Sequence, residues 1–262
     1  MIVRGCNLKC PDCIHYSHSL SGYVSVEKFI EWSEAWATRI RPRVFSITGG
    51  ETILHPHLTD ILWEAKRIWH PAELWLLTNG TLPHRITPAL LEALKDCHVI
   101  ISAKPYMEML GKDYTDKVRE SFGIYYDHGI PLYPRNAGMW KCFDDIATEP
   151  DNDPDEAFGN CLYRNCSFAI DEGKLWQCQH LFILNELKKR GKIDWQTLDG
   201  YQPLGCDCSD DAIRNVLEQK FSHEWCKFCP PAHTLLYKAN SHLPPSPPEH
   251  LPGNRRAVSK IW

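Results

Sequence analysis

The chain has 262 residues, of which 43% are hydrophobic, and carries a formal net charge of −4. This length allows one large α/β domain and a smaller second domain. The pI of about 6.3 argues against a nucleic-acid-binding protein. No apolar run reaches the roughly 20 residues of a membrane helix. Because only five residues precede Cys6, we expect no signal peptide and a cytoplasmic, membrane-free protein.

Strand-like and helix-like segments alternate through the first 140 residues. We expect strands at residues 1–4, 44–48, 74–77, 98–102 and 130–133, and helices at residues 26–39, 58–69, 88–94 and 113–127. Strands that alternate with helices form βαβ units and a parallel sheet. The pattern therefore predicts an α/β fold, a shortened and partial (β/α) TIM-like barrel, with its chemistry at the carboxyl ends of the strands.

The character of the sequence changes after Trp140. Residues 147–155 are acidic with two prolines, which is typical of a linker. A β-hairpin is predicted around Gly173, with strands at 167–170 and 175–177, and a helix at 211–220. Five prolines in residues 243–253 indicate an extended segment. We therefore expect three parts: the partial barrel at residues 1–140, a small C-terminal domain with the hairpin at 141–242, and a Pro-rich tail at 243–262.

The chain has 12 cysteines, and in a reducing cytosol such a number indicates metal binding more often than disulfides. Cys6, Cys10 and Cys13 follow the spacing C-x3-C-x2-C on one short loop. Three thiolates can hold three irons of a [4Fe–4S] cubane and leave the fourth iron open. The alternative is structural zinc, which His15 and His18 would complete with Cys10 and Cys13.

The cysteine loop resembles that of the radical S-adenosylmethionine (SAM) superfamily. Two later segments agree with this resemblance: a predicted strand that runs into Gly49-Gly50-Glu51, and the next strand, which ends in Thr-Asn-Gly at residues 78–80. The resemblance covers roughly the first half of the chain. Asp12 and Thr52 depart from it, because an aromatic residue and a proline are common at these positions in the family.

The resemblance implies a radical enzyme with two cofactors, a [4Fe–4S] cluster on the cysteine trio and SAM on its open iron. It implies that Glu51 accepts a hydrogen bond from the methionine ammonium, beside Gly49 and Gly50, whose missing Cβ atoms let backbone approach a ligand. Asn79 and Ser102 follow strands where the family often contacts SAM, although a cap or turn is the alternative for each. An electron donor such as flavodoxin or ferredoxin is the expected partner.

The later cysteines are similar to the twitch form of the SPASM auxiliary-cluster domain of this superfamily. This resemblance implies an auxiliary [4Fe–4S] cluster, and hence a C-terminal iron–sulfur domain, with four ligands: Cys161, Cys178, Cys226 and Cys229. Structural zinc is the alternative for this group. Cys166 could replace Cys161. Further cysteines, which could be ligands, hydrogen-atom donors or free thiols, are Cys142, Cys166, Cys206 and Cys208. Cys97 is expected to be a buried hydrophobic residue.

These resemblances favour an enzyme that cleaves SAM reductively, abstracts hydrogen from a C–H bond, and oxidises or epimerises a small polar or carbohydrate-like substrate. The short barrel and twitch-like pattern resemble the dehydrogenases of aminocyclitol antibiotic biosynthesis, and no room for a peptide-recognition domain precedes Cys6. One alternative is a maturase of a ribosomally synthesised peptide, served by a separate recognition protein. The other is a non-catalytic zinc-binding interaction protein. The pattern assigns no catalytic side chain.

Overall fold

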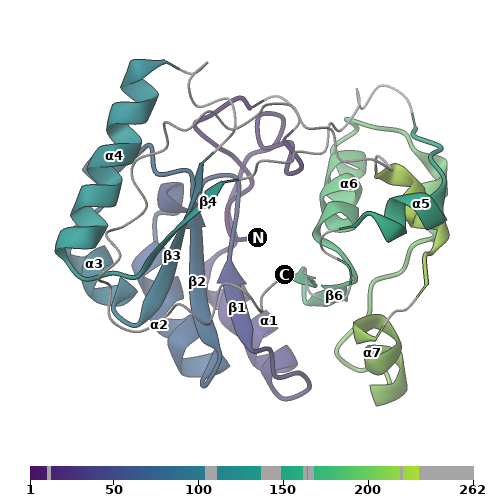
Figure 1. The fold of residues 1–262 in the computed structure, drawn as a ribbon. Coiled ribbons are helices and arrows are strands. Elements are labelled where there is room, and N and C mark those ends of the chain that lie inside the picture. The colour runs from purple at the N-terminus through teal and green to yellow at the C-terminus, as the bar shows by residue number, and fades with distance from the viewer. Residues whose placement is uncertain are drawn as a thin grey trace.

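The larger part of the molecule is built on a parallel four-stranded sheet (Figure 1). The computed structural model describes residues 1–10, 13–103, 111–136, 149–161, 164, 168–218 and 221–229. The strands are β1 (Val44–Ile47), β2 (Glu73–Thr78), β3 (Cys97–Ala103) and β4 (Leu132–Asn136), and they lie side by side in that order. This sheet confirms the predicted α/β class and is consistent with a partial barrel.

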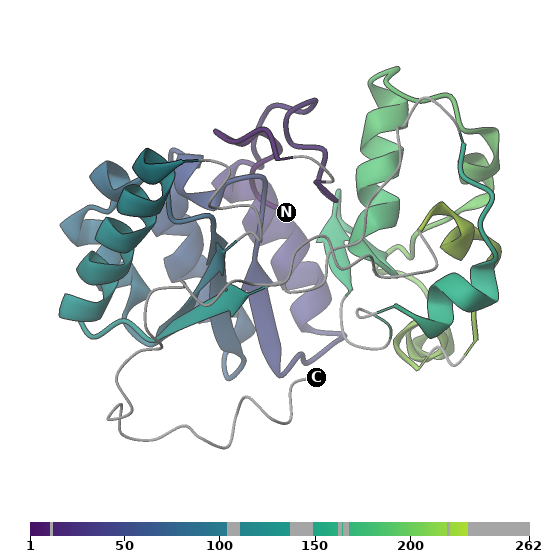
Figure 2. The same ribbon diagram turned by 45° about the horizontal axis from the view of Figure 1, so that its top comes forward.

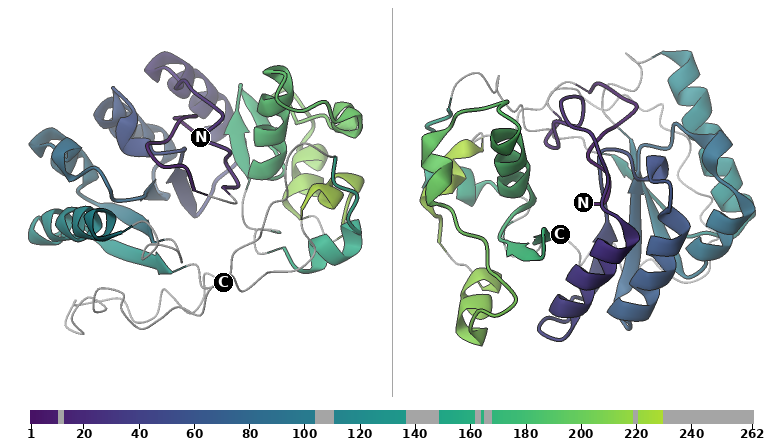
Figure 3. Two further views of the ribbon diagram at one scale, coloured as in Figure 1. Left: turned by 90° about the horizontal axis from the view of Figure 1, so that it is seen from above. Right: turned by 180° about the vertical axis from the view of Figure 1, so that it is seen from behind.

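Four helices connect and cover the strands, namely α1 (Val26–Ala37), α2 (Leu58–Trp69), α3 (Pro88–Leu94) and α4 (Lys112–Asp127). Because each right-handed crossover moves to the next strand in the same direction, all four helices fall on one face of the sheet, as the view from above shows (Figure 3). The bounds predicted for α2 and α3 are confirmed to the residue.

Local sequence explains where these helices begin. The side chain of Ser25 accepts a hydrogen bond from the backbone N–H of Lys28 at the start of α1. Thr87 does the same for Leu90 at the start of α3, where Pro88 occupies the first helical position. Hydroxyl caps of this kind each stabilise a helix by about 1 kcal/mol.

The helix-covered face of the sheet forms the main core. Leu76 of β2 and Val99 of β3 are completely buried, as are Ile61 and Leu62 of α2. Burying one such aliphatic side chain contributes about 1.5–3 kcal/mol. The core therefore holds the strands firmly enough to position groups at their carboxyl ends.

The first residues do not form the regular strand that was predicted at 1–4. Val3 makes single bridges, parallel to Gly49 and antiparallel to Tyr23. The N–H of Ile2 donates to the carbonyl of Thr48 at 2.8 Å, and the N–H of Gly50 donates to the carbonyl of Val3 at 2.8 Å. This short pairing places the cysteine loop above the end of β1.

The second part contains α5 (Pro154–Gly159), α6 (Gln179–Lys189), α7 (Asp210–Leu217) and the predicted hairpin, formed by β5 (Ala169–Asp171) and β6 (Lys174–Trp176). The two-residue loop of the hairpin has positive φ at both Glu172 (50°) and Gly173 (71°). Positive φ at both positions is the geometry of a type I′ turn, whose twist matches that of paired strands.

Two helices of this part were not predicted. The segment read as a linker contains the start of α5, because Asp153 caps the N–H groups of Asp155 and Glu156 and Pro154 follows at the first position. Helix α6 is apolar on several sides, and its residues 181–184 are at most 2% exposed. A helix buried in this way lacks the one-sided pattern that identifies helices in a sequence.

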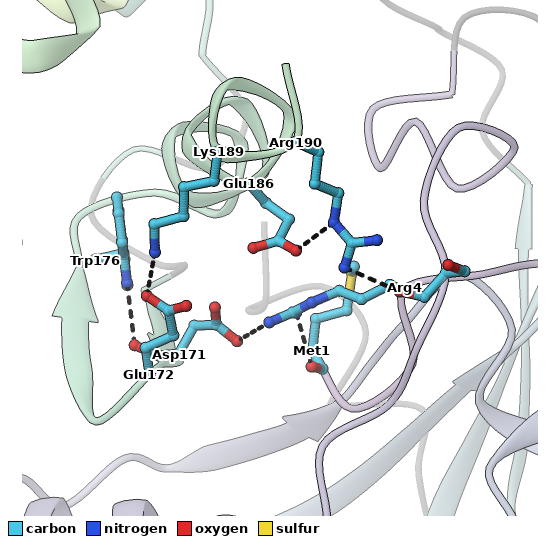
Figure 4. Close-up of polar contacts among 9 residues, drawn as sticks. Met1, Arg4, Asp171, Glu172, Trp176, Glu186, Lys189 and Arg190 are labelled. Atoms are coloured by element: carbon cyan, nitrogen blue, oxygen red, sulfur yellow. Dashed lines mark hydrogen bonds and ion pairs between the residues drawn. The ribbon is translucent and has the colours of Figure 1, made fainter. Parts of the chain in front are cut away.

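The second part packs against α1 and the N-terminal segment (Figure 2). The indole N–H of Trp36 donates to the carbonyl of Gly173 at 3.0 Å. Arg4 and Asp171 form a buried ion pair beside the end of α6, where Arg190 donates to Glu186 and to the carbonyl of Ser21 (Figure 4). The two parts therefore share a polar contact as well as an apolar one.

Some expectations fall on residues that the structure does not describe. These are the Pro-rich tail, the boundary near residue 140, and Cys142 and Cys166. Among the described helices, none combines the length and the apolar character needed to cross a bilayer.

Candidate functional site

The carboxyl ends of β1 and β2 meet the cysteine loop at one edge of the sheet. Glu51 follows β1, Asn79 follows β2, and the N–H of Glu51 donates to the carbonyl of Gly5 at 3.0 Å. The amide of Asn79 reaches the sulfur of Cys6. Ser102 belongs to β3, and its side chain lies outside the described part of the chain.

Within the loop, the thiol of Cys6 interacts with those of Cys10 and Cys13. Burial and the charges of Glu51, Cys10 and Cys13 together raise the pKa of Cys6 to about 11, and the hydrogen bond from Leu8 opposes this rise. The backbone N–H of Leu8 donates to the Cys6 sulfur at 3.4 Å. Three neighbouring thiols and a backbone donor fit the three ligated corners of a cubane, whose sulfurs accept hydrogen bonds from the protein.

The histidines next to the loop have contacts of their own. Nε2 of His15 lies 2.6 Å from Nε2 of Gln179 at the start of α6, and His18 is exposed. No three His, Cys, Asp or Glu side chains within the described ranges could hold a single metal ion. A cubane differs from a single ion in this respect, because each of its irons takes its own thiolate.

Asn79 connects the end of β2 to the cysteine loop. Its Nδ2 donates to Cys6 Sγ at 3.6 Å and to Asn7 Oδ1 at 3.0 Å. Its Oδ1 accepts from the N–H and the hydroxyl of Thr81, at 2.9 and 2.6 Å. Nδ2 of Asn7 donates to the same hydroxyl at 2.8 Å. Asn79 therefore makes the contacts of a turn, which was the alternative role expected for it, and it also contacts the sulfur of Cys6. The sequence reasoning missed Asn7 and Thr81, although both adjoin predicted site residues.

Glu51 is 1% exposed and joins the ends of two strands. Its Oε1 accepts hydrogen bonds from the N–H of Ile53 at 3.0 Å and the hydroxyl of Thr78 at 2.7 Å, and its Oε2 accepts from the N–H of Asn79 at 2.7 Å. Burial raises the pKa of this carboxyl, and these three donors oppose the rise. The hydrogen bonds hold the carboxylate in one orientation at the edge of the sheet.

Gly49 and Gly50 lie against the backbone of the N-terminal segment. A Cβ on Gly49 would lie 2.9 Å from the carbonyl oxygen of Val3, and a Cβ on Gly50 would lie 2.1 Å from that of Gly5. Real Cβ atoms do not come this close to backbone atoms. The glycines thus allow the N-terminal segment to approach the turn closely.

The second group of cysteines comes from three separate segments. Cys178 precedes α6, and burial together with the charges of Cys161 and Cys226 raises its pKa to about 12. Cys161 follows α5, which packs beside the 3-10 helix Glu224–Phe228 that contains Cys226. These thiols therefore lie near one another, as a shared cluster requires.

Cys229 joins this group through a histidine. Nδ1 of His180 lies 3.3 Å from Cys229 Sγ, and the ring of His223 lies beside Cys226 with both nitrogens 3.7 Å from its sulfur. The sequence reasoning assigned no role to either histidine. The sequence feature that could have indicated them is their closeness to expected ligands, since His180 stands two residues after Cys178 and His223 three residues before Cys226.

Three other cysteines have different surroundings. Arg39, after the end of α1, donates to the backbone carbonyls of Cys206 and Cys208 and to the carboxylate of Asp210. The loop of Cys206 and Cys208 thus belongs to the contact between α1 and α7. Cys97 is 1% exposed, which confirms the expected buried residue.

Comparison with known proteins adds two findings. The sequence profile of the Radical SAM superfamily matches residues 1–131. The chain is also 26% identical over 158 residues to the antilisterial bacteriocin subtilosin biosynthesis protein AlbA of Bacillus subtilis (strain 168). That similarity covers 55% of this chain and 34% of AlbA, so the chain spans about a third of the length of this relative.

Proposed function

Because the chain belongs to the radical SAM superfamily, a superfamily of enzymes, we propose that it removes a hydrogen atom from a C–H bond of a ribosomally synthesised peptide. The observation that carries the reaction type is the convergence of Cys6, Glu51 and Asn79 at the carboxyl edge of the sheet. Functional groups of parallel β/α folds gather at this edge.

In this proposal Cys6, Cys10 and Cys13 hold a [4Fe–4S] cluster. A cluster held by these residues would supply the electron for reductive cleavage of SAM, and hence the radical chemistry that removes hydrogen from a C–H bond. An external donor such as flavodoxin or ferredoxin provides that electron.

In this scheme the chain's own residues bind the cluster and SAM and fix their orientation. Asn79 donates to the Cys6 sulfur and stabilises its thiolate form. Glu51 is aligned by Thr78 and Asn79. Among the described residues, Asn79 N–H is the one donor to Glu51 Oε2, so this oxygen retains capacity for the methionine ammonium. Ser102 lies near the carboxyl end of β3, the next strand, and is proposed to contact SAM.

The substrate class rests on the similarity to AlbA, whose name places it in the biosynthesis of a bacteriocin, a peptide. This similarity favours the peptide alternative over the small polar or carbohydrate-like substrate expected at first. Whether the peptide is oxidised, epimerised or cross-linked follows from the fate of the substrate radical after the same abstraction.

The second cysteine group is proposed to hold an auxiliary [4Fe–4S] cluster, with Cys161, Cys178, Cys226 and Cys229 as ligands. The interactions of Cys178 with Cys161 and with Cys226 and the position of His180 beside Cys229 support this assignment. A fully ligated cluster suits the transfer of one electron to or from a substrate radical.

Anaerobic reconstitution tests both clusters. The wild type should hold about eight irons and the variant with Cys6, Cys10 and Cys13 replaced by alanine about four, because each cubane contributes four. The triple variant should make no 5′-deoxyadenosine from SAM under dithionite, whereas the control Cys97→Ala should retain both clusters. Production of 5′-deoxyadenosine by the triple variant, or zinc in the second group, would contradict these assignments.

The substrate is tested by mass spectrometry. Co-expression with short peptides encoded beside the gene should yield a peptide whose mass or stereochemistry changes only when the cysteine trio is intact. SAM cleavage that is stimulated by polyols or amino sugars, and by no peptide, would refute the peptide assignment and restore the small polar substrate.

A further inference from the structure

We propose that His180 is a positioning residue that donates a hydrogen bond from Nδ1 to the thiolate of Cys229 and thereby raises the reduction potential of the auxiliary cluster. The inference rests on the proposed auxiliary cluster and names a residue outside its four ligands. Its basis is the 3.3 Å separation between Nδ1 of His180 and Sγ of Cys229.

The direction of this hydrogen bond follows from the acceptor. A cysteine that ligates iron is a thiolate, which has no proton to give, so the proton must lie on Nδ1 of His180. Hydrogen bonds to an ionised acceptor are stronger than those between neutral groups. His180 is only 4% exposed, so water competes little for this contact.

The position of the ring is defined by the loop of the first cluster. Tyr16 stacks on His180 with ring centroids 6.2 Å apart and an interplanar angle of 13°. The backbone N–H of Tyr16 donates to the carbonyl of Cys13 at 2.8 Å, and Tyr16 is itself 7% exposed. The loop that carries the cysteine trio therefore packs directly on the histidine that contacts the second cysteine group.

The effect on the cluster is electrostatic. One-electron reduction adds negative charge that spreads onto the thiolate sulfurs, so a donor at Cys229 stabilises the reduced state more than the oxidised one. Hydrogen bonds to sulfur are among the factors that set the potentials of iron–sulfur clusters. Removing the donor should therefore make the cluster harder to reduce.

The test is an EPR-monitored redox titration with dithionite as the electron source. The full chain is used with Cys6, Cys10 and Cys13 replaced by alanine, so that only the auxiliary cluster is titrated. His180→Phe removes the donor and keeps a ring against Tyr16. His180→Asn restores an N–H close to the position of Nδ1. The exposed His128 carries the matched control, His128→Phe.

We expect His180→Phe to lower the equilibrium constant for reduction at least tenfold, which is a fall of about 59 mV for a one-electron couple. His180→Asn should recover most of this change, and His128→Phe should cause none. Iron content and circular dichroism are measured on the same samples, so that loss of fold is recognised.

The other outcomes separate the inference from its premise. A retained cluster with an unchanged potential in His180→Phe would overturn the role of His180 and leave the auxiliary cluster standing. Loss of iron in both His180 variants would make His180 a ligand or a folding residue and would also overturn the inference. Absence of iron from the parent with His180 intact would refute the auxiliary cluster, and the inference with it.

Discussion

Nη2 of Arg4 lies 2.6 Å from Oδ1 of Asp171, and the two side chains are 9% and 4% exposed. Arg4 directly precedes the cysteine loop, whereas Asp171 ends the first strand of the hairpin (Figure 4). Arg4 also donates to the carbonyl of Met1 and lies over the ring of Phe182. One ion pair thus joins the segment that carries the first cysteine group to the part that carries the second.

Replacing one partner of this ion pair should strongly destabilise the folded protein. Arg4→Met should lower the free energy of unfolding by about 3–5 kcal/mol, because it leaves the Asp171 carboxylate buried without a counter-charge. The double variant Arg4→Met/Asp171→Leu should lose less than the sum of the two single changes. Urea unfolding provides the four free energies of this cycle.

The control for this cycle is the exposed pair of Arg67 and Glu34, whose side chains are 55% and 52% exposed. Arg67→Met should cost less than about 1 kcal/mol, since exposed ion pairs contribute little. A cost for Arg4→Met as small as that for Arg67→Met would show that the buried pair does not hold the two parts together.

Gly50→Ala should prevent formation of the site. The new Cβ would lie 2.1 Å from the carbonyl oxygen of Gly5 and 2.7 Å from Oγ of Ser17. Because backbone must move, the cysteine loop should be displaced, and we expect little soluble protein or loss of the first cluster on iron analysis.

Gly123 offers the matched control for this substitution. It lies within α4, and a Cβ added there would meet no atom within 4 Å beyond its own helix backbone and chain neighbours. Gly123→Ala should raise the free energy of unfolding by about 0.5–1 kcal/mol, as alanine does within a helix. Normal iron content in Gly50→Ala would contradict the proposed backbone contact.

Glu51→Ala should weaken SAM binding. A charge-assisted hydrogen bond is worth about 1.5–3 kcal/mol, so we expect the affinity to fall on the order of tenfold to a hundredfold in calorimetry on the reconstituted protein. Iron content should be retained. Stability should also decrease, because Thr78 and two backbone N–H groups lose their acceptor.

Two further variants separate binding from stability. Thr78→Val removes one donor to Glu51 but keeps the carboxylate. It should therefore lower the free energy of unfolding and leave the SAM affinity nearly unchanged. Glu31→Ala, on the exposed face of α1, should change neither. Unchanged SAM affinity in a folded Glu51→Ala protein would show that Glu51 serves only to join the strand ends.

His55 should make stability depend on pH. Nε2 of His55 contacts the carbonyl of Val24 at 2.8 Å, and Nδ1 accepts from the N–H of His57 at 3.0 Å, so the ring is neutral with its proton on Nε2. Burial lowers the pKa of His55 below its ordinary value of 6.5. The contribution of the neutral His55 ring to the free energy of unfolding is fully present above pH 6.5 and is lost as the pH falls through the lowered pKa.

The variant His55→Gln tests this dependence, because its amide can still donate to Val24 but does not titrate. In urea unfolding, the wild type should lose stability relative to His55→Gln as the pH is lowered from 7 to about 5. His128→Gln at an exposed position is the control. Parallel pH profiles for wild type and His55→Gln would refute the assignment.

Local sequence patterns were sufficient for much of the larger part. Helices α2 and α3 were predicted to the residue, because each has one apolar face and α3 also has a hydroxyl cap followed by proline. The hairpin was predicted from Gly173, because glycine readily adopts the positive φ of a tight turn, and the structure shows that this turn is of type I′. Helix α6 was missed because its burial on several sides removes the periodic signal.

The sequence by itself determined the alternation of strands and helices, the cysteine spacing and the position of Gly49-Gly50-Glu51 after a strand, because these depend on neighbours within a few residues. The tertiary structure alone decided three contacts: Arg4 with Asp171, Asn79 with Cys6, and His180 with Cys229. Each joins segments at least 49 residues apart, and in the extended chain nothing distinguishes these partners from others of the same type. Only the folding of the chain into its tertiary structure brings each of these pairs within interaction distance.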